Sequence, residues 1–144
     1  MNMYQAIALD LDGVVTDTKK LHFQAWKEVF DSYLEDKNGQ EPFSEMDYAK
    51  RVDGLLRLDG VRTFLDARGI EANEKLVKEL GDKKNQRYSD LLSERGPEVF
   101  ADSVEAIKNW KDKGIAVAIV SSSKNTPMVL EKAGITHLFE GKHA

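Results

Sequence analysis

The spacing of hydrophobic residues changes along the chain, and this change separates predicted strands from predicted helices. Two short runs are almost wholly apolar, AIAL at residues 6–9 and IAVAIV at residues 115–120. The second run is rich in β-branched residues, as expected of a strand that is buried on both faces. Elsewhere, apolar residues recur every three or four positions, the period of an amphipathic helix. ITHLFE, at residues 135–140, predicts a third, short strand.

Predicted helices occupy most of the remaining chain. In the first, four aromatic residues between Phe23 and Tyr33 form one stripe. The spacing of Asp102 and Glu105 suggests a capping box for a later helix. The predicted helices cover residues 17–34, 44–52, 59–69, 72–96, 102–114 and 126–134. This order predicts a parallel α/β sheet with a helical insertion between its first two strands.

The composition is typical of a globular protein, with 41% hydrophobic and 32% charged residues in a chain of 144. No apolar run approaches the roughly 20 residues that cross a bilayer, and the first residues do not resemble a signal peptide. The absence of cysteine excludes disulfides and thiolate sites, and we expect the cytoplasm. The formal charge of −4 disfavours a nucleic-acid partner, and we expect no membrane partner either.

Two aspartates, Asp10 and Asp12, stand one residue apart directly after the first predicted strand, and Gly13 follows. Asp-Gly between apolar residues is also a hairpin signal, so this stretch alone leaves a turn open. The next element is a predicted helix, which weakens the hairpin interpretation. Two carboxylates this close are stable together only where a positive charge neutralises them, and oxygen ligands suit Mg²⁺.

A second polar cluster, SSSKN at residues 121–125, follows the second predicted strand. Its hydroxyls, backbone amides and ammonium group are the parts of a phosphate-binding loop. The alternative is a polar connection that only caps the next helix. Because ligands of parallel α/β sheets bind at the carboxyl ends of the strands, we expect both clusters at one crevice. Together they indicate phosphoryl transfer.

DLDGVVTDT at residues 10–18 resembles the first motif of the haloacid dehalogenase (HAD) superfamily, and VSSSKN at 120–125 resembles the second. The resemblance to the β-phosphoglucomutase-like branch extends over nearly the whole chain. It implies a Rossmann-like core of residues 1–17 and 97–144 with a helical cap at residues 18–96. It also implies a Mg²⁺-dependent phosphatase or phosphomutase that acts on a small sugar phosphate through an aspartyl-phosphate intermediate.

The resemblance assigns roles to individual residues of the core. Asp10 matches the nucleophile and a Mg²⁺ ligand. Asp12 matches the general acid and base, and its backbone carbonyl matches a second metal ligand. Ser121 matches the phosphate-binding hydroxyl, with Ser122 and Asn125 as further candidates.

In the cap, His22, Arg57 and Lys84 match positions that bind the sugar phosphate or couple cap closure to chemistry. Each also has an ordinary interpretation. His22 would be a surface or capping histidine, whereas Arg57 and Lys84 would be solvated cations. We interpret Trp26 as a core residue of the cap.

The sequence departs from the family pattern near its end. The family's third motif supplies a lysine and its fourth supplies acidic metal ligands, but Lys142 is the only late lysine and no acidic cluster follows. We therefore expect an incomplete core with an unpaired strand edge, which favours association with a second copy. The alternative function is an impaired or non-catalytic domain that binds phosphate or a partner.

Overall fold

The computed structural model describes residues 6–139, and it confirms the predicted α/β class. The elements are β1 (Ala6–Asp10), α1 (Lys19–Leu34), α2 (Glu45–Asp47), the π-helix η1 (Tyr48–Val52), α3 (Arg57–Ala67), α4 (Glu74–Arg95), α5 (Ala101–Asp112), β2 (Ala116–Val120), α6 (Thr126–Lys132) and the 3₁₀ turn η2 (Thr136–Leu138). They form two compact units, which we call the core unit (residues 6–19 and 95–139) and the cap unit (residues 20–94). No described helix is both long enough and apolar enough to span a membrane.

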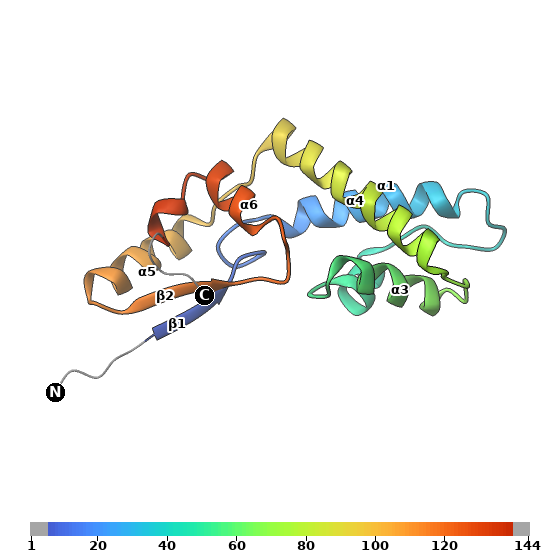
Figure 1. Ribbon diagram of the computed structural model, residues 1–144. Coiled ribbons are helices and arrows are strands. Elements are labelled where there is room, and N and C mark those ends of the chain that lie inside the picture. Colours follow the sequence, from blue (N-terminus) through green and yellow to red (C-terminus); the bar gives the residue numbers. More distant parts are fainter. Residues whose placement is uncertain (1–5, 140–144) are drawn as a thin grey trace. The chain divides into compact units, whose positions relative to one another are not determined.

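β1 and β2 lie side by side as a parallel pair in the core unit (Figure 1). Their register runs from Ala6 opposite Ala116 to Asp10 opposite Val120. The hairpin interpretation of Asp-Gly is therefore wrong, because the partner of β1 is a distant strand. Gly13 instead turns the chain toward α1 with a φ of +82°, and its N–H donates to the Thr16 carbonyl at 2.7 Å.

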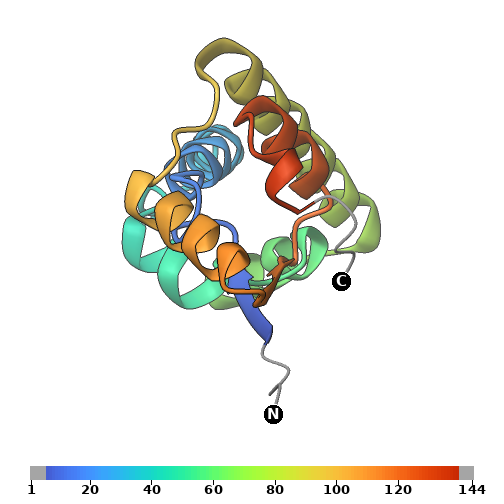
Figure 2. The same ribbon diagram turned by 90° about the vertical axis from the view of Figure 1, so that its left-hand side faces the viewer.

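The strands are less buried than the sequence predicts. In β2 only Val117 is buried, and 57% of the Val120 surface is exposed. The expectation that β2 is buried on both faces is wrong for the described residues, in which the sheet consists of these two strands. A strand is buried on both faces only where other elements cover both. α5 precedes β2 and α6 follows it (Figure 2, orange and red).

The third predicted strand is a 3₁₀ turn. Leu138 N–H donates to the Ile135 carbonyl, and Phe139 N–H donates to the Thr136 carbonyl, both at 3.0 Å. Ile135, Leu138 and Phe139 are all buried. Their spacing of three and four residues is helical, so a turn directs all three inward where an alternating strand would not.

The predicted capping box at Asp102 is also wrong, because α5 begins one residue earlier. Phe100 occupies the N-cap position without a side-chain cap. Its backbone N–H donates to the Val15 carbonyl at 2.9 Å, which holds Phe100 extended. Asp102 therefore lies in the first turn of the helix, where a carboxylate still interacts favourably with the helix dipole.

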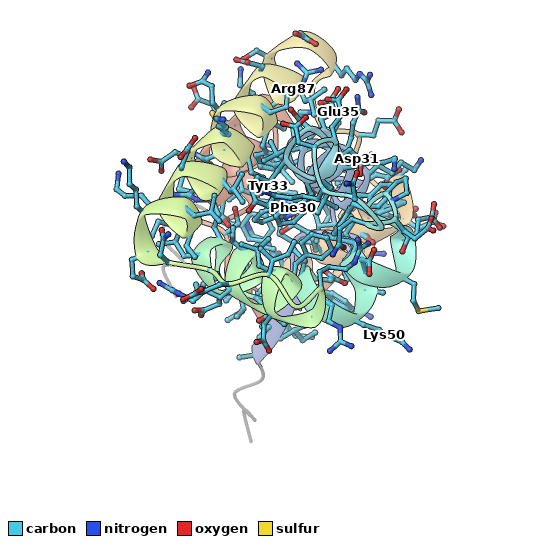
Figure 3. All side chains as sticks on the ribbon, turned by 90° about the vertical axis from the view of Figure 1, so that its right-hand side faces the viewer. Phe30, Asp31, Tyr33, Glu35, Lys50 and Arg87 are labelled. Atoms are coloured by element: carbon cyan, nitrogen blue, oxygen red, sulfur yellow. The ribbon has the colours of Figure 1, made fainter. Side chains whose placement is uncertain are left out.

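Aromatic side chains form the centre of the cap unit, as the stripe on α1 predicts. Phe30 is fully buried inside the cap unit (Figure 3). The centre of its ring lies 4.2 Å from that of Phe64 and 5.0 Å from that of Trp26. Trp26 is 3% exposed, which confirms its core interpretation. From α3, Val61, Phe64 and Leu65 turn the same helix face inward. The cap unit thus has its own hydrophobic core.

Candidate active site

The two aspartates leave the end of β1 in different environments. Asp10 is the last residue of β1 and is exposed, whereas Asp12 is half-buried. Between them, Leu11 is 1% exposed, and its carbonyl accepts hydrogen bonds from the N–H groups of Val15 and Thr16, each at 3.0 Å. The buried Leu11 therefore anchors a tight turn that carries both carboxylates.

Hydrogen bonds from both sides orient the Asp12 carboxylate. Ser121 Oγ, from the residue after β2, donates to Asp12 Oδ2 at 3.5 Å, and Thr18 Oγ1 donates to Asp12 Oδ1. Thr18 in turn lies 2.8 Å from the hydroxyl of Thr16, and both threonines are completely buried. The parallel strands thus bring residues 12 and 121 together, as expected for ends that share one sheet edge.

Asp10 is the less constrained of the two carboxylates. Within residues 6–139, no hydrogen bond or ion pair is formed by its side chain, and the residue is exposed. Its carboxylate and the backbone carbonyl of Asp12 are oxygen donors of the kind that Mg²⁺ prefers. The described part of the chain contains no group of three or more acidic or histidine side chains that could hold a metal. The fit to Mg²⁺ therefore rests on these two donors, and Mg²⁺ commonly keeps several water ligands.

The loop after β2 is ordered by its own serines. Ser123 N–H donates to Ser121 Oγ, and Asn125 N–H donates to Ser123 Oγ, both at 3.1 Å. Thr126 Oγ1 donates to the Ser123 carbonyl at 2.8 Å. Asn125 occupies the N-cap position of α6 without a side-chain cap, and Ser122 is exposed. Ser123 takes part in all three of these hydrogen bonds, through its N–H, its Oγ and its carbonyl, and the sequence analysis did not single it out.

Two of the three predicted cap residues form a buried pair. Lys84 Nζ lies 2.8 Å from His22 Nδ1, although 62 positions separate the two in sequence. Lys84 is 4% exposed and His22 is 9% exposed, so the interpretations as a solvated lysine and a surface histidine are wrong. The His22 ring stacks on the Tyr88 ring, with 4.0 Å between the ring centres. Lys84 Nζ lies 4.7 Å from the centre of the Tyr88 ring. The ammonium group is thus enclosed by aromatic faces.

Arg57, the third cap residue, is the first residue of α3 and is half-buried. Its Nε is buried and has no hydrogen-bond partner among the described residues. Packing contacts rather than hydrogen bonds therefore hold the stem of this side chain.

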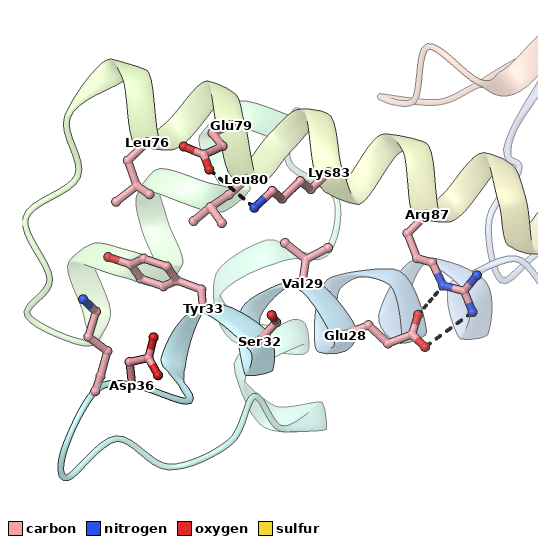
Figure 4. A pocket seen from close by; sticks show the side chains of 11 residues that line it. Glu28, Val29, Ser32, Tyr33, Asp36, Leu76, Glu79, Leu80, Lys83 and Arg87 are labelled. Carbon is pink, nitrogen blue, oxygen red and sulfur yellow. Dashed lines mark hydrogen bonds and ion pairs between the residues drawn. The ribbon is translucent and has the colours of Figure 1, made fainter.

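A separate hollow of about 640 Å³ lies between α1 and α4 (Figure 4). None of the predicted site residues lines it. Four of its charged side chains form pairs with each other, Arg87 with Glu28 at 2.5 Å and Lys83 with Glu79 at 3.4 Å. The hollow is therefore distinct from the candidate site.

Two further residues contact the candidate site, and the sequence analysis did not assign them to it. Thr18 lies six residues after Asp12, and this spacing contains no periodic signal that would pair the two side chains. Tyr88 lies four residues after Lys84 on α4, so the two side chains share one helix face. The sequence shows that spacing, but by itself the spacing predicts only that both residues belong to one helix.

Comparison with known proteins identifies the class to which this fold and site belong. The family model for haloacid dehalogenase-like hydrolases matches residues 4–144, and the chain belongs to that family. A crystal structure of β-phosphoglucomutase from Clostridium difficile superposes with a TM-score of 0.80 at 24% identity. It covers 96% of this chain and 60% of that protein. The structural match confirms the predicted fold.

Two curated relatives indicate the branch of the family. The chain is 40% identical to a β-phosphoglucomutase of Mycobacterium bovis, covering 91% of this chain and 56% of the relative. It is 31% identical to a phosphorylated carbohydrates phosphatase of Thermotoga maritima, covering 83% of this chain and 50% of the relative. The chain thus spans about half the length of these curated relatives.

Proposed function

We propose that the chain carries part of the active site of a Mg²⁺-dependent phosphatase or phosphomutase that acts on a small sugar phosphate. The observation that carries this proposal is the contrast between the two carboxylates. Asp12 is oriented by Thr18 and Ser121, whereas Asp10 is exposed at the strand end. One carboxylate is thus suited to transfer a proton in a defined direction, and the other to attack an incoming phosphorus.

In the proposed first step, an oxygen of Asp10 attacks phosphorus, and the bond from phosphorus to the sugar oxygen breaks. Asp12, in its protonated form, donates its proton to the leaving sugar oxygen. In the second step, water or a sugar hydroxyl attacks the aspartyl phosphate, and Asp12 takes up the proton of this nucleophile. The Asp10 carboxylate is then released, and both residues return to their starting state.

Asp10 and the Asp12 carbonyl would hold Mg²⁺, which when bound neutralises negative charge on the phosphoryl group. Ser121 is the proposed phosphate-binding hydroxyl, since its Oγ already lies beside Asp12. Ser122 and Asn125 remain candidates on the same loop. In the cap unit, Arg57 and the pair of His22 and Lys84 are proposed to bind the sugar phosphate.

The names of the relatives support a phosphorylated carbohydrate as substrate, since one is a β-phosphoglucomutase and another a phosphorylated carbohydrates phosphatase. A second candidate function is binding of phosphate or a partner without turnover. It is favoured by the absence of a three-ligand acidic cluster in the described part of the chain. Lys142, the one candidate for the third motif, lies outside the described residues.

The test is phosphate release from a panel of sugar phosphates, including β-glucose 1-phosphate, with Mg²⁺ and with the metal removed by a chelator. We expect release that depends on Mg²⁺ and is abolished in Asp10→Asn. Asp102→Asn, an exposed carboxylate of the same unit, is the matched control and should retain full activity. Normal phosphate release by the Asp10→Asn variant would refute catalysis by Asp10.

A folded chain that releases no phosphate but still binds inorganic phosphate would favour the second function. Binding is measured by the shift of backbone amide signals of residues 121–125 on titration with phosphate. Ser121→Ala should abolish that shift, because it removes the proposed ligand hydroxyl.

A further inference from the structure

A buried glycine interrupts the middle of α4 without any need for an unusual backbone conformation. Gly81 is buried, and its φ is not among the positive values found at the turn glycines. Glycine is a poor helix former, so its presence inside a helix usually has a packing reason. The reason here is space for the first turn of α3.

The neighbours of Gly81 define that space. A methyl group at residue 81 would lie 2.6 Å from Leu58 Cδ2, well inside van der Waals contact. The same methyl would lie 3.7 Å from Arg57 Cγ and 3.8 Å from Arg57 Nε, in ordinary contact. Leu58 therefore lies directly over the glycine, and the stem of Arg57 lies beside Leu58.

Arg57 depends on this packing because its buried Nε forms no hydrogen bond among the described residues. A buried N–H without a partner does not fix the direction of a side chain, so the surrounding walls must do so. Lys84 is three residues after Gly81, and both are buried on α4. Residues at this spacing share a helix face, which places the Arg57 stem along the same face as Lys84.

We propose that Gly81 and Leu58 form a packing surface that sets the direction of the Arg57 guanidinium, and we call this surface the seat of Arg57. Gly81 is then a positioning residue for sugar phosphate binding, a consequence that rests on the proposed function of Arg57. The seat itself is a property of the packing and is testable without any activity.

The primary test is the ¹⁵N–¹H NMR signal of Arg57 Nε in the full chain, assigned by its loss in Arg57→Lys. We expect Gly81→Ala to shift this signal, because the added methyl displaces Leu58 against the Arg57 stem. Leu58→Ala/Gly81→Ala should return it toward its original position, since Leu58→Ala removes the clashing atoms and the methyl group at residue 81 fills part of the space that Leu58 Cδ2 leaves. Leu91→Ala, also buried on α4 but ten residues after Gly81, is the control for general loosening and should leave the signal in place.

Leu58→Ala alone removes one wall without adding volume, and it should also shift the Nε signal. This variant tests the seat even where Gly81→Ala fails to fold. An Nε signal that stays in place in both Leu58→Ala and Gly81→Ala would overturn the inference.

The functional consequence is tested with β-glucose 1-phosphate as the probe. Gly81→Ala should raise KM about tenfold at unchanged kcat, the size expected for loss of one hydrogen bond from a charged group. Adding Leu58→Ala to Gly81→Ala should restore KM. The KM of Arg57→Ala/Gly81→Ala should be no higher than the KM of Arg57→Ala alone. The two proposals can fail separately. If the Nε signal shifts in Gly81→Ala and returns in the double variant, but Arg57→Ala leaves the affinity for β-glucose 1-phosphate unchanged, the seat is supported and the proposed role of Arg57 is overturned.

Discussion

Asp47 links the start of α2 to the end of α3, and its charge makes the stability of the cap unit depend on pH. Its Oδ2 accepts hydrogen bonds from Ser44 N at 2.9 Å, from Ser44 Oγ at 3.0 Å and from Arg68 Nη2 at 2.7 Å. Burial by itself raises the pKa of Asp47, but the bonds from Ser44 and Arg68 outweigh it, so the pKa lies below its usual value.

The contacts set the size of the effect of Asp47→Asn. The Ser44–Asp47 capping box is complete, and loss of such a cap costs about 1 kcal/mol. The ion pair with Arg68 has side chains that are 15% and 23% exposed, and pairs near the surface contribute roughly 0.2–1 kcal/mol. Because asparagine keeps part of the cap, we expect a loss of about 1–2 kcal/mol in the free energy of unfolding at neutral pH.

The direction of the pH dependence follows from the lowered pKa. A carboxyl whose pKa is lower in the folded state than in the unfolded state stabilises the fold above the unfolded pKa. This contribution is lost as the pH falls through the folded pKa, which lies below the usual aspartate pKa of 3.8. The difference between the wild-type chain and Asp47→Asn should therefore shrink toward zero in acid.

The measurement is urea unfolding followed by far-UV circular dichroism, at about pH 7 and at steps down to about pH 2. Asp66→Asn, an exposed carboxylate on α3, is the matched control and should change stability little at either pH. An Asp47→Asn difference that is equal at neutral and acid pH would refute the assigned role of the charge. No difference at neutral pH would refute the capping contribution as well.

Two other substitutions test the site and the core. Thr18→Val keeps the shape of the buried side chain but removes its hydrogen bond to the Asp12 carboxylate, so we expect unfolding to be easier by about 1.5–3 kcal/mol. Urea unfolding measures this loss, and wild-type stability would show that the bond contributes nothing. Phe30→Ala removes a fully buried ring that contacts Trp26 and Phe64 and should cost about 3–5 kcal/mol. A loss below about 1.5 kcal/mol in the same assay would contradict the central place of Phe30 in the cap core.

Local pattern was enough to predict most helices and the neighbouring positions of the two polar clusters. The inward face of α3 followed from the spacing of Val61, Phe64 and Leu65, because helical periodicity places such residues on one side. The meeting of Asp12 and Ser121 followed from two apolar runs that each end in polar residues. Parallel strands end at one edge of a sheet, so this contact required no knowledge of the packing.

Pattern failed where several elements together decide the outcome. Residues 135–139 contain three apolar side chains and therefore suggested a strand, but the burial of Ile135, Leu138 and Phe139 around a 3₁₀ turn depends on which side the core lies. The exposure of Val120 depends on which elements cover the sheet, and no local sequence encodes that.

The sequence by itself determined the class of protein, the order of its elements and the acidic and serine-rich ends of its strands. Only the tertiary structure decided that Thr18 orients Asp12, that His22 and Lys84 form a buried pair, and that Gly81 makes room for Leu58. Helical and strand periods are local properties of the backbone, and a few neighbouring residues express them. Contacts between helices depend on the size and direction of side chains from distant segments, which meet only when the whole unit packs.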